Sequence, residues 1–320
     1  MASETNEALS VWTYRSLYGI VWLLSLIPFR AGQSLGRMLG NVLALVLKRR
    51  IKASLDNLRY AFGNSMSEIE LIELNGRIVA HFTQMLFEAP HILRLNRANL
   101  NRYVVFENED ALRQAMEKEE GIFILTAHFG NWELMSAATA LRFNVDGAVV
   151  VRPADFAPAD RLLTSLRSRF GTEIIPKRRA MKKLLAAKKE NKVVGILLDQ
   201  NVDWYEGVFV PFMGKPACAN KGLALVALRT GSPVIPAFSV RELDGRYRII
   251  FENEVKLVRT GDKIKDTEEN TALFTQIIEK YVRENPDHWL WFHKRWKTRP
   301  YCPLPEDFYH RRDTDDGAIS

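Results

Sequence analysis

The sequence predicts an α/β fold: a single domain with a largely parallel mixed sheet covered by helices, preceded by an N-terminal hydrophobic helical anchor. From about residue 103 onward, short β-like runs alternate with helical stretches, which is typical of a parallel sheet covered on both faces. Before that point the chain reads as helical and opens with apolar runs. Hydrophobic residues make up 47% of the 320 residues and charged residues 26%, which excludes a disordered chain.

Two apolar runs predict the anchor, within residues 1–50. The first run covers residues 11–29 and is interrupted only by Arg15, and the second covers residues 40–47. Because a membrane-spanning helix needs about 20 apolar residues, the runs predict helices that lie in a bilayer or just cross it. The basic residues within 48–52 would then lie on the cytoplasmic side. A pair of buried core helices is the alternative.

A long helix is expected over residues 66–95. Its start carries a capping-box pattern, Ser67 followed by Glu70. Apolar residues then recur at steps of three and four, which places them on one helical face: Leu71, Leu74, Ile78, Phe82 and Met85. This stripe indicates core packing rather than a functional site.

The following elements form the predicted sheet and its cover. Strand-like runs occupy residues 103–108, 121–127, 146–153, 172–176, 193–199, 233–238 and 247–253. Helical patterns occupy residues 109–119, 131–141, 158–170, 178–190, 220–231 and 268–284. We therefore expect one α/β domain over residues 51–303 and a polar, poorly ordered tail over residues 304–320.

One group of residues combines chemistry with a favourable position. His128 follows an apolar strand, and ligands of open α/β sheets bind at the carboxyl ends of strands. Gly130 permits a sharp turn, Asn131 is a candidate helix N-cap, and Glu133 falls in the first helical turn. This strand–turn–helix junction can fold Glu133 back so that it accepts the proton of one imidazole nitrogen, leaving the other nitrogen as a base. A histidine that is merely hydrogen-bonded at a helix start is the alternative.

The string HFGNWE at residues 128–133 resembles the first block of the lysophospholipid acyltransferase superfamily, His-x4-Asp/Glu. Further strings resemble one branch of that superfamily, the bacterial late (lauroyl/myristoyl) acyltransferases of lipid A biosynthesis. These strings are RRIKASLDNLRYAFGNSMSE, DQNVDWYEGVFVPFMGKPA, TGSPVIPAF and WLWFHKRWKTRP. The resemblance runs from about residue 10 to residue 303, which makes residues 51–303 the expected acyltransferase domain.

The resemblance implies an activity and its participants. His128 would be the general base and Glu133 its partner. The acceptor would be a hydroxyl on an acyl chain of a lipid A precursor, and the donor an acyl group on acyl carrier protein. Transfer would be direct, without a cofactor or metal, and backbone N–H groups at the start of the 131–141 helix would stabilise the oxyanion. The protein would act at the cytoplasmic face of a bacterial inner membrane.

Several other residues are candidates for substrate binding, Asn131 among them. Arg152 closes a strand and suits bidentate contacts to phosphate, although a surface salt bridge explains it equally well. Asp199 and Gln200 end the strand at 193–199, at the same edge of the sheet as His128. Asp199 would either bind substrate or anchor a loop.

The block GVFVPFMG supplies four more candidates. Gly207 and Gly214 permit tight turns, while Phe209 and Phe212 are placed to line an acyl tunnel or to pack in the core. The superfamily's comparable block contacts the acceptor phosphate through Glu-Gly-Thr-Arg. This chain has Glu-Gly-Val-Phe at residues 206–209, which argues against arginine-mediated phosphate binding there.

The net charge and the cysteine content limit which classes of binding partner and metal site we expect. The net charge of +7 attracts anionic partners, for which we expect acyl carrier protein and anionic membrane lipid rather than nucleic acid. The basic stretch at residues 177–192 is either a docking site for acidic acyl carrier protein or a solvated helix face. Two distant cysteines and the scattered histidines lack metal-ligand spacing. The rival functions are acyl transfer to a lysophospholipid or another glycolipid, and a basic membrane-peripheral lipid-binding protein without turnover.

Overall fold

The computed structural model describes residues 2–177 and 180–301. The predicted tail at residues 304–320 lies outside these residues, as does Cys302.

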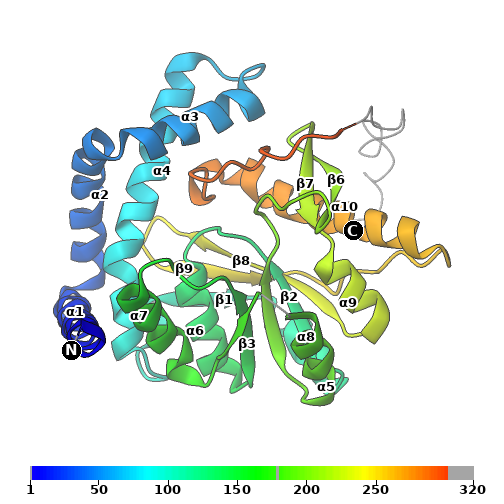
Figure 1. Ribbon diagram of the computed structural model, residues 1–320, viewed down its shortest axis with the longest axis horizontal. Helices are drawn as coiled ribbons and strands as arrows, with labels where there is room; N and C mark the ends of the chain where they lie inside the picture. The colour runs from blue at the N-terminus through cyan, green and yellow to red at the C-terminus, as the bar shows by residue number, and fades with distance from the viewer. Residues whose placement is uncertain (1, 178–179, 302–320) are drawn as a thin grey trace.

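A seven-stranded mixed sheet forms the centre of the molecule, with strand order β1-β9-β8-β2-β5-β3-β4 (Figure 1). All neighbouring strands are parallel except β8 and β9, which pair antiparallel. The strands are β1 (Val104–Glu107), β2 (Ile122–Thr126), β3 (Gly147–Val151), β4 (Glu173–Pro176), β5 (Val193–Leu197), β8 (Val234–Arg241) and β9 (Tyr247–Phe251). Each corresponds to one predicted run, so the predicted α/β domain with a largely parallel sheet is confirmed.

Helices cover both faces of the sheet (Figure 1). They are α5 (Glu109–Glu117), α6 (Trp132–Phe143), α7 (Ala157–Arg167), α8 (Ala180–Lys189), α9 (Gly222–Thr230) and α10 (Lys263–Glu284). Side chains alternate between the two faces along each strand, so successive residues join different cores. Ile124 of β2 packs with α5 and α6, whereas its neighbours Phe123 and Leu125 pack in the core that contains α8, α9 and α10.

A separate hairpin was not expected from the sequence. Strands β6 (Gly207–Phe212) and β7 (Lys215–Asn220) pair antiparallel around a turn in which Met213 and Gly214 both have positive φ, 53° and 71°. The predicted tight turn at Gly214 is thus confirmed, but the one at Gly207 is wrong. Gly207 instead allows a close approach, since a Cβ there would lie 2.6 Å from the Ala219 carbonyl oxygen.

Four helices precede the sheet: α1 (Ala2–Leu24), α2 (Phe29–Val46), α3 (Lys48–Phe62) and α4 (Glu68–Glu88). Helix α4 begins with the predicted capping box, in which Ser67 and Glu70 each bond the other's backbone N–H. Its predicted stripe is buried, apart from a half-buried Phe82. Helix α2 packs so closely along α4 that a Cβ at Gly36 would come within 2.6 Å of the Gln84 Cα. The glycine is therefore what permits this approach.

Helices α1 and α2 lie together at one side of the molecule (Figure 1). Both present apolar side chains to solvent. These exposed side chains are Trp12, Ile20, Trp22 and Leu23 of α1, and Leu35, Met38, Val42 and Val46 of α2. The alternative of two buried core helices is therefore wrong. Within residues 2–177 and 180–301, no helix has the length and apolar character needed to cross a bilayer.

Candidate functional site

The site is organised around a hydrogen bond between His128 and Asp199. His128 follows β2 and Asp199 follows β5, and these two strands are parallel neighbours, so their carboxyl ends meet at one sheet edge. The Nδ1 atom of His128 lies 2.9 Å from Oδ1 of Asp199. The Asp199 side chain is fully buried, whereas 23% of the His128 side chain is exposed. The carboxylate therefore orients the imidazole through Nδ1, and Nε2 is the nitrogen that could accept a proton from a ligand.

Asp199 remains charged because its surroundings compensate for its burial. Its second oxygen, Oδ2, accepts a 2.8 Å hydrogen bond from the indole N–H of Trp289, which is itself fully buried. Burial raises the pKa of the Asp199 carboxyl, but the His128 imidazole and the hydrogen bonds from His128 and Trp289 outweigh it and hold the pKa well below its usual range. The carboxylate is thus a fixed acceptor for the imidazole N–H.

The loop that carries His128 is held by the chain segment around Trp289. The His128 carbonyl oxygen accepts a bond from the Leu290 N–H, and the Gly130 N–H donates to the His288 carbonyl oxygen. Gly130 has a φ of 59°, and a Cβ there would lie 1.7 Å from the Ser239 carbonyl oxygen. The sharp turn predicted at Gly130 is therefore confirmed, and close packing as well as conformation requires a glycine.

The structure corrects the expected contact between Glu133 and His128. The Glu133 carboxylate instead accepts hydrogen bonds from Arg167, at 2.9 Å from Nε, and from the indole N–H of Trp132, at 3.0 Å. Burial alone would lower the pKa of the Arg167 guanidinium, but the Glu133 carboxylate outweighs it and raises that pKa. The Trp132 ring lies edge-on against the His128 ring with centroids 5.1 Å apart. Glu133 therefore reaches the imidazole only indirectly, through Trp132.

Asn131 is the predicted N-cap, and a buried carboxylate holds it. Its side-chain oxygen accepts from the Leu134 N–H at 3.0 Å, while its amide donates to Oε2 of Glu88 at 3.0 Å. Glu88 is fully buried and also accepts hydrogen bonds from Arg241 and Tyr247. A carboxylate from α4 thus fixes the start of α6, next to the loop that carries His128.

We expect Glu88→Ala to lower the free energy of unfolding by about 3–5 kcal/mol, because it leaves the largely buried Arg241 guanidinium without its charge partner. Urea unfolding followed by circular dichroism measures this. The matched control is Glu254→Ala, which breaks an exposed ion pair with Lys118 and is expected to cost at most about 1 kcal/mol. Equal losses in the two variants would contradict the role given to Glu88.

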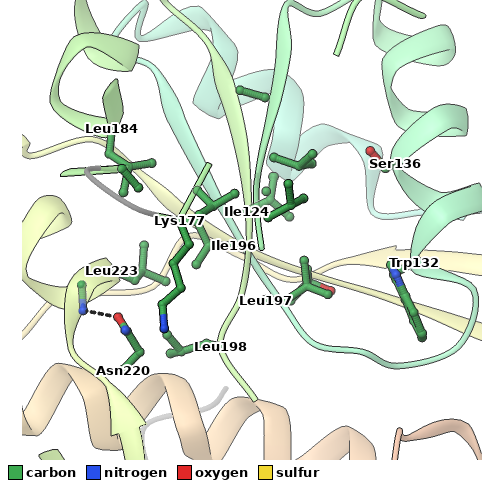
Figure 2. Close-up of a pocket in the computed structure, with 18 of the residues that line it drawn as sticks. Ile124, Trp132, Ser136, Lys177, Leu184, Ile196, Leu197, Leu198, Asn220 and Leu223 are labelled. Carbon is green, nitrogen blue, oxygen red and sulfur yellow. Dashed lines mark hydrogen bonds between the residues drawn. The ribbon is translucent and has the colours of Figure 1, made fainter. Parts of the chain in front are cut away.

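A cavity of about 660 Å³ opens beside the His128 ring. His128, Glu133, Arg167 and Gln200 line it, and apolar residues of β2, β3 and β5 form much of its wall. Figure 2 shows Trp132 and Ser136 on one side of the central strand and Lys177, Leu184 and Leu223 on the other. His128 therefore lies where a ligand with both apolar and polar parts can reach it.

Two further candidates line this cavity. Gln200 lies against the imidazole, with its amide nitrogen 3.4 Å from Nε2 of His128, which is long for a hydrogen bond. Arg152 lines the cavity and also pairs with Asp155, and both side chains are largely exposed. Of the two explanations for Arg152, the surface salt bridge is present, and a phosphate contact remains a prediction.

The four candidates of the block GVFVPFMG lie in the β6–β7 hairpin, and none is among the described residues that line the cavity: Gly207, Phe209, Phe212 and Gly214. The Phe212 ring is buried between Trp289 and Trp296, with centroids 5.3 Å and 5.8 Å away. Packing against Trp289 links this ring to the residue that supports Asp199. Of the two alternatives for Phe212, a tunnel wall or the core, the structure shows the core.

Residue-level reasoning missed two contributors to the site, Trp289 and Arg167. A buried tryptophan needs an acceptor for its N–H, and this requirement was the available signal for Trp289. Arg167 ends α7, and the local sequence gives no signal that it meets Glu133. Among residues 2–177 and 180–301, no group of three or more His, Cys, Asp or Glu side chains is placed to hold a metal ion.

Comparison with known proteins gives consistent matches along the chain. The family model described as bacterial lipid A biosynthesis acyltransferase matches residues 3–298. The lipid A biosynthesis lauroyltransferase of Escherichia coli (strain K12) is 27% identical over 287 residues, covering 88% of this chain and 90% of that protein. The palmitoleoyltransferase of the same strain is 24% identical over the same shares. A lipid A biosynthesis acyltransferase of Haemophilus influenzae is 22% identical over 303 residues, 92% of each chain.

Proposed function

The chain belongs to the bacterial lipid A biosynthesis acyltransferase family, and from this premise we propose that it transfers an acyl group from acyl carrier protein to a hydroxyl of a lipid A precursor, with His128 as general base. The observation that carries the proposal is the His128–Asp199 pair at the edge of a cavity. A protein that only binds lipid has no need of an imidazole oriented by a buried carboxylate. This arrangement therefore favours turnover over the rival of a non-catalytic binding protein.

The proposed reaction follows from the orientation of the imidazole. With Nδ1–H donated to Asp199, Nε2 accepts the proton of the acceptor hydroxyl as its oxygen attacks the thioester carbonyl carbon. The carbon–sulfur bond then breaks, the acyl group stays on the acceptor oxygen, and His128 returns the proton to the departing thiolate. Asp199 stabilises the imidazolium between the two transfers. The serine of a hydrolase triad is replaced by the hydroxyl of the substrate.

The oxyanion formed on the thioester carbonyl needs N–H donors close to His128. Neighbouring N–H groups are already occupied: that of Asn131 donates to the Ser239 hydroxyl, and that of Leu134 to the Asn131 side chain. This leaves the first-turn N–H groups of Trp132 and Glu133 as our candidates, at the positive end of the α6 dipole.

We propose that Glu133 contributes to catalysis as a positioning residue. Its carboxylate holds the indole of Trp132 and the guanidinium of Arg167, and both of these side chains line the cavity. Trp132 in turn packs edge-on against the imidazole. Glu133 therefore sets the shape and charge of the cavity wall where the substrates meet the base, while Asp199 orients the base itself.

The acceptor is a membrane lipid, and we propose that α1 and α2 bring the protein to it as interfacial helices. Their exposed apolar side chains include Trp12, Trp22, Met38 and Val42. The basic start of α3, residues 48–52, continues directly from α2 and suits anionic headgroups. This surface supports a place at the inner membrane, with the helices lying on it rather than spanning it.

We expect the double variant Met38→Asp/Val42→Asp to weaken binding to vesicles containing phosphatidylglycerol by at least about tenfold, because two apolar side chains become anionic. Vesicle flotation measures this binding. The matched control, Ile264→Asp, alters an equally exposed residue at the start of α10, away from α1 and α2. Loss of binding in the control alone, or in both variants, would contradict the assigned surface.

The acyl donor is proposed from the family resemblance and from charge. Helix α8 carries Lys182, Lys183, Lys188 and Lys189, and its neighbour Lys177 lines the cavity. Acyl carrier protein is acidic, so this side of the molecule would attract it and bring the thioester to the cavity. Lys183 and Lys177 pair with Glu173 and Glu206, which reduces the net positive field near the cavity.

The test of the proposed function is acyl transfer by the purified protein. It is incubated with lauroyl-acyl carrier protein and a lipid A precursor that carries free hydroxyl groups, and the lipid is analysed by mass spectrometry. We expect a gain of one acyl group on the lipid and release of the carrier thiol. Transfer to a lysophospholipid but not to the precursor would favour the rival acceptor. Vesicle binding without transfer to either acceptor would favour the non-catalytic function.

A further inference from the structure

Part of the cavity lies between α6 and the sheet, and we call this part the α6-side chamber. Strand residues that face α6 should be buried in a packed sheet, but Gly195 and Leu197 of β5 and Val149 of β3 are only half-buried. Their neighbours Val194 and Ile196, which face the opposite side, are buried. The space between α6 and the sheet is therefore open rather than filled by side chains.

The strand register divides the floor of this chamber into three rows that recede from His128. Thr126 and Leu197 form the first row, next to the catalytic loop. The second row is Ile124, Gly195 and Val149, and the third is Val193 and Gly147. Successive rows are two residues apart, about 6.6 Å, which is roughly five methylene groups of an extended alkyl chain.

The α6 residues on the opposite wall of the chamber have nearly the same spacing as these rows. Trp132, Ser136 and Ala140 of α6 all line the cavity, and each lies one helical turn, about 6 Å, beyond the last. Ser136 and Ala140 are small, so the wall leaves most room opposite the second and third rows. Both walls thus describe one narrow space that starts at the base and leads away from it.

We propose that the α6-side chamber holds the acyl chain of the thioester donor and that Gly195 and Gly147 set the chain length it accepts. This proposal rests on the proposed acyl-transfer function. Where the two strands lack side chains, the chamber is deep enough for an alkyl chain to pass. A side chain at either glycine would end the chamber at that row.

The donor fits the chamber better than the acceptor does. The reacting carbonyl carbon is the first atom of the donor's acyl chain, so a donor poised at His128 must send its whole chain away from that point. The chamber starts at His128 and leads away from it, which matches this requirement. The acceptor reacts through a hydroxyl and has no such requirement. The other side of the cavity carries the charged pair Lys177 and Glu206, which suits the polar portions of the substrates.

Both glycines can be replaced without disturbing the backbone. A Cβ at Gly195 would lie 3.3 Å from Cγ1 of Val149, and one at Gly147 would lie 3.2 Å from Oγ1 of Thr172. These neighbours are side-chain ends that can shift slightly. Neither glycine has a positive φ, and valine is well suited to a strand. Valine at either position should therefore fill the chamber and leave the sheet intact.

The test is a competition among donors in one reaction. Octanoyl-, decanoyl-, lauroyl-, myristoyl- and palmitoyl-acyl carrier protein are mixed in equal amounts with a fixed lipid A precursor, and the products are separated by mass. The ratio of products reports relative kcat/KM and does not depend on how much of a variant is folded. The variants are Gly195→Val and Gly147→Val. The control is Gly76→Val, at an exposed position in α4 with open space around it.

We expect Gly195→Val to lower the ratio of the longest accepted product to the decanoyl product by at least about tenfold, since it removes roughly five methylene groups or more of depth. Gly147→Val should lower it less and only for the longest chain, and Gly76→Val should not change it. Ratios unchanged in both chamber variants, or a shift that follows the acceptor's chain length when that is varied, would overturn the proposal. A wild-type protein that transfers no acyl group would instead defeat the proposed function.

Discussion

Replacing His128 with alanine is expected to reduce acyl transfer by about a hundredfold or more, because the acceptor hydroxyl loses the group that takes its proton. Steady-state rates with lauroyl-acyl carrier protein and a lipid A precursor measure this effect. Vesicle binding should stay at the wild-type level, since α1 and α2, the proposed membrane-binding helices, lie on a different part of the molecule. A rate within about tenfold of wild type would remove the imidazole from the mechanism.

Chemical rescue separates a lost base from a disturbed fold. The His128 side chain is 23% exposed and borders the cavity, so the alanine variant leaves a space that free imidazole can enter. We expect added imidazole to restore part of the activity of His128→Ala and to leave Glu133→Gln unaffected, because that variant retains its base. Unfolding by urea should be cooperative in both variants. Absence of rescue together with a lowered unfolding free energy would point to structural damage.

The sheet and the position of the base could be predicted from local sequence. Each strand of the main sheet matches an apolar run, and the capping box of α4 and the N-cap at Asn131 each depend on residues three positions apart. The turn at Gly130 is marked by the glycine itself. Such features are determined locally, so one sequence is enough to find them. The β6–β7 hairpin was missed because its turn places Met213, a residue that rarely adopts a positive φ, in that conformation.

The partner of His128 depends on the order of the strands and therefore could not be predicted in the same way. Asp199 is 71 residues from His128, and the two meet only because β5 lies next to β2. Sequence alone placed both residues at the same edge of a sheet but gave no neighbour relations. The nearby Glu133 was the natural choice, and its actual partner, Arg167, comes from a helix whose docking no local pattern specifies.

Asp199→Asn is expected to lower the rate of acyl transfer by about a hundredfold or more, as far as the loss in His128→Ala, because it acts through the tautomer of His128. Trp289 can only donate a hydrogen bond, so the oxygen of the new side-chain amide must face Trp289 and its NH₂ group must face Nδ1 of His128. The imidazole then has to accept at Nδ1 and carry its proton on Nε2. A protonated Nε2 cannot take the proton of the acceptor hydroxyl, so the base is blocked although its position is unchanged.

The same substitution is expected to change the free energy of unfolding by an amount that depends on pH. Because the folded-state pKa of Asp199 is depressed, its charge contributes stability that is present above the unfolded pKa of about 4 and is lost as the pH falls through the folded pKa. The difference in unfolding free energy between wild type and Asp199→Asn should therefore be largest near neutral pH and shrink below about pH 4. Urea unfolding at a series of pH values measures this difference. A difference that grows in acid would contradict the assigned charge state.

Glu133→Gln is the matched control for the orienting role, since it makes the same chemical change on the neighbouring carboxylate. The glutamine side chain can still accept from Trp132, but it lacks the charge that pairs with Arg167. We expect a smaller loss of rate than in Asp199→Asn, with the pH profile of kcat/KM retained, because the tautomer of His128 is untouched. If Asp199→Asn kept its activity while Glu133→Gln abolished it, the catalytic imidazole would be oriented by Glu133, and the hydrogen bond to Asp199 would serve only to hold the loop.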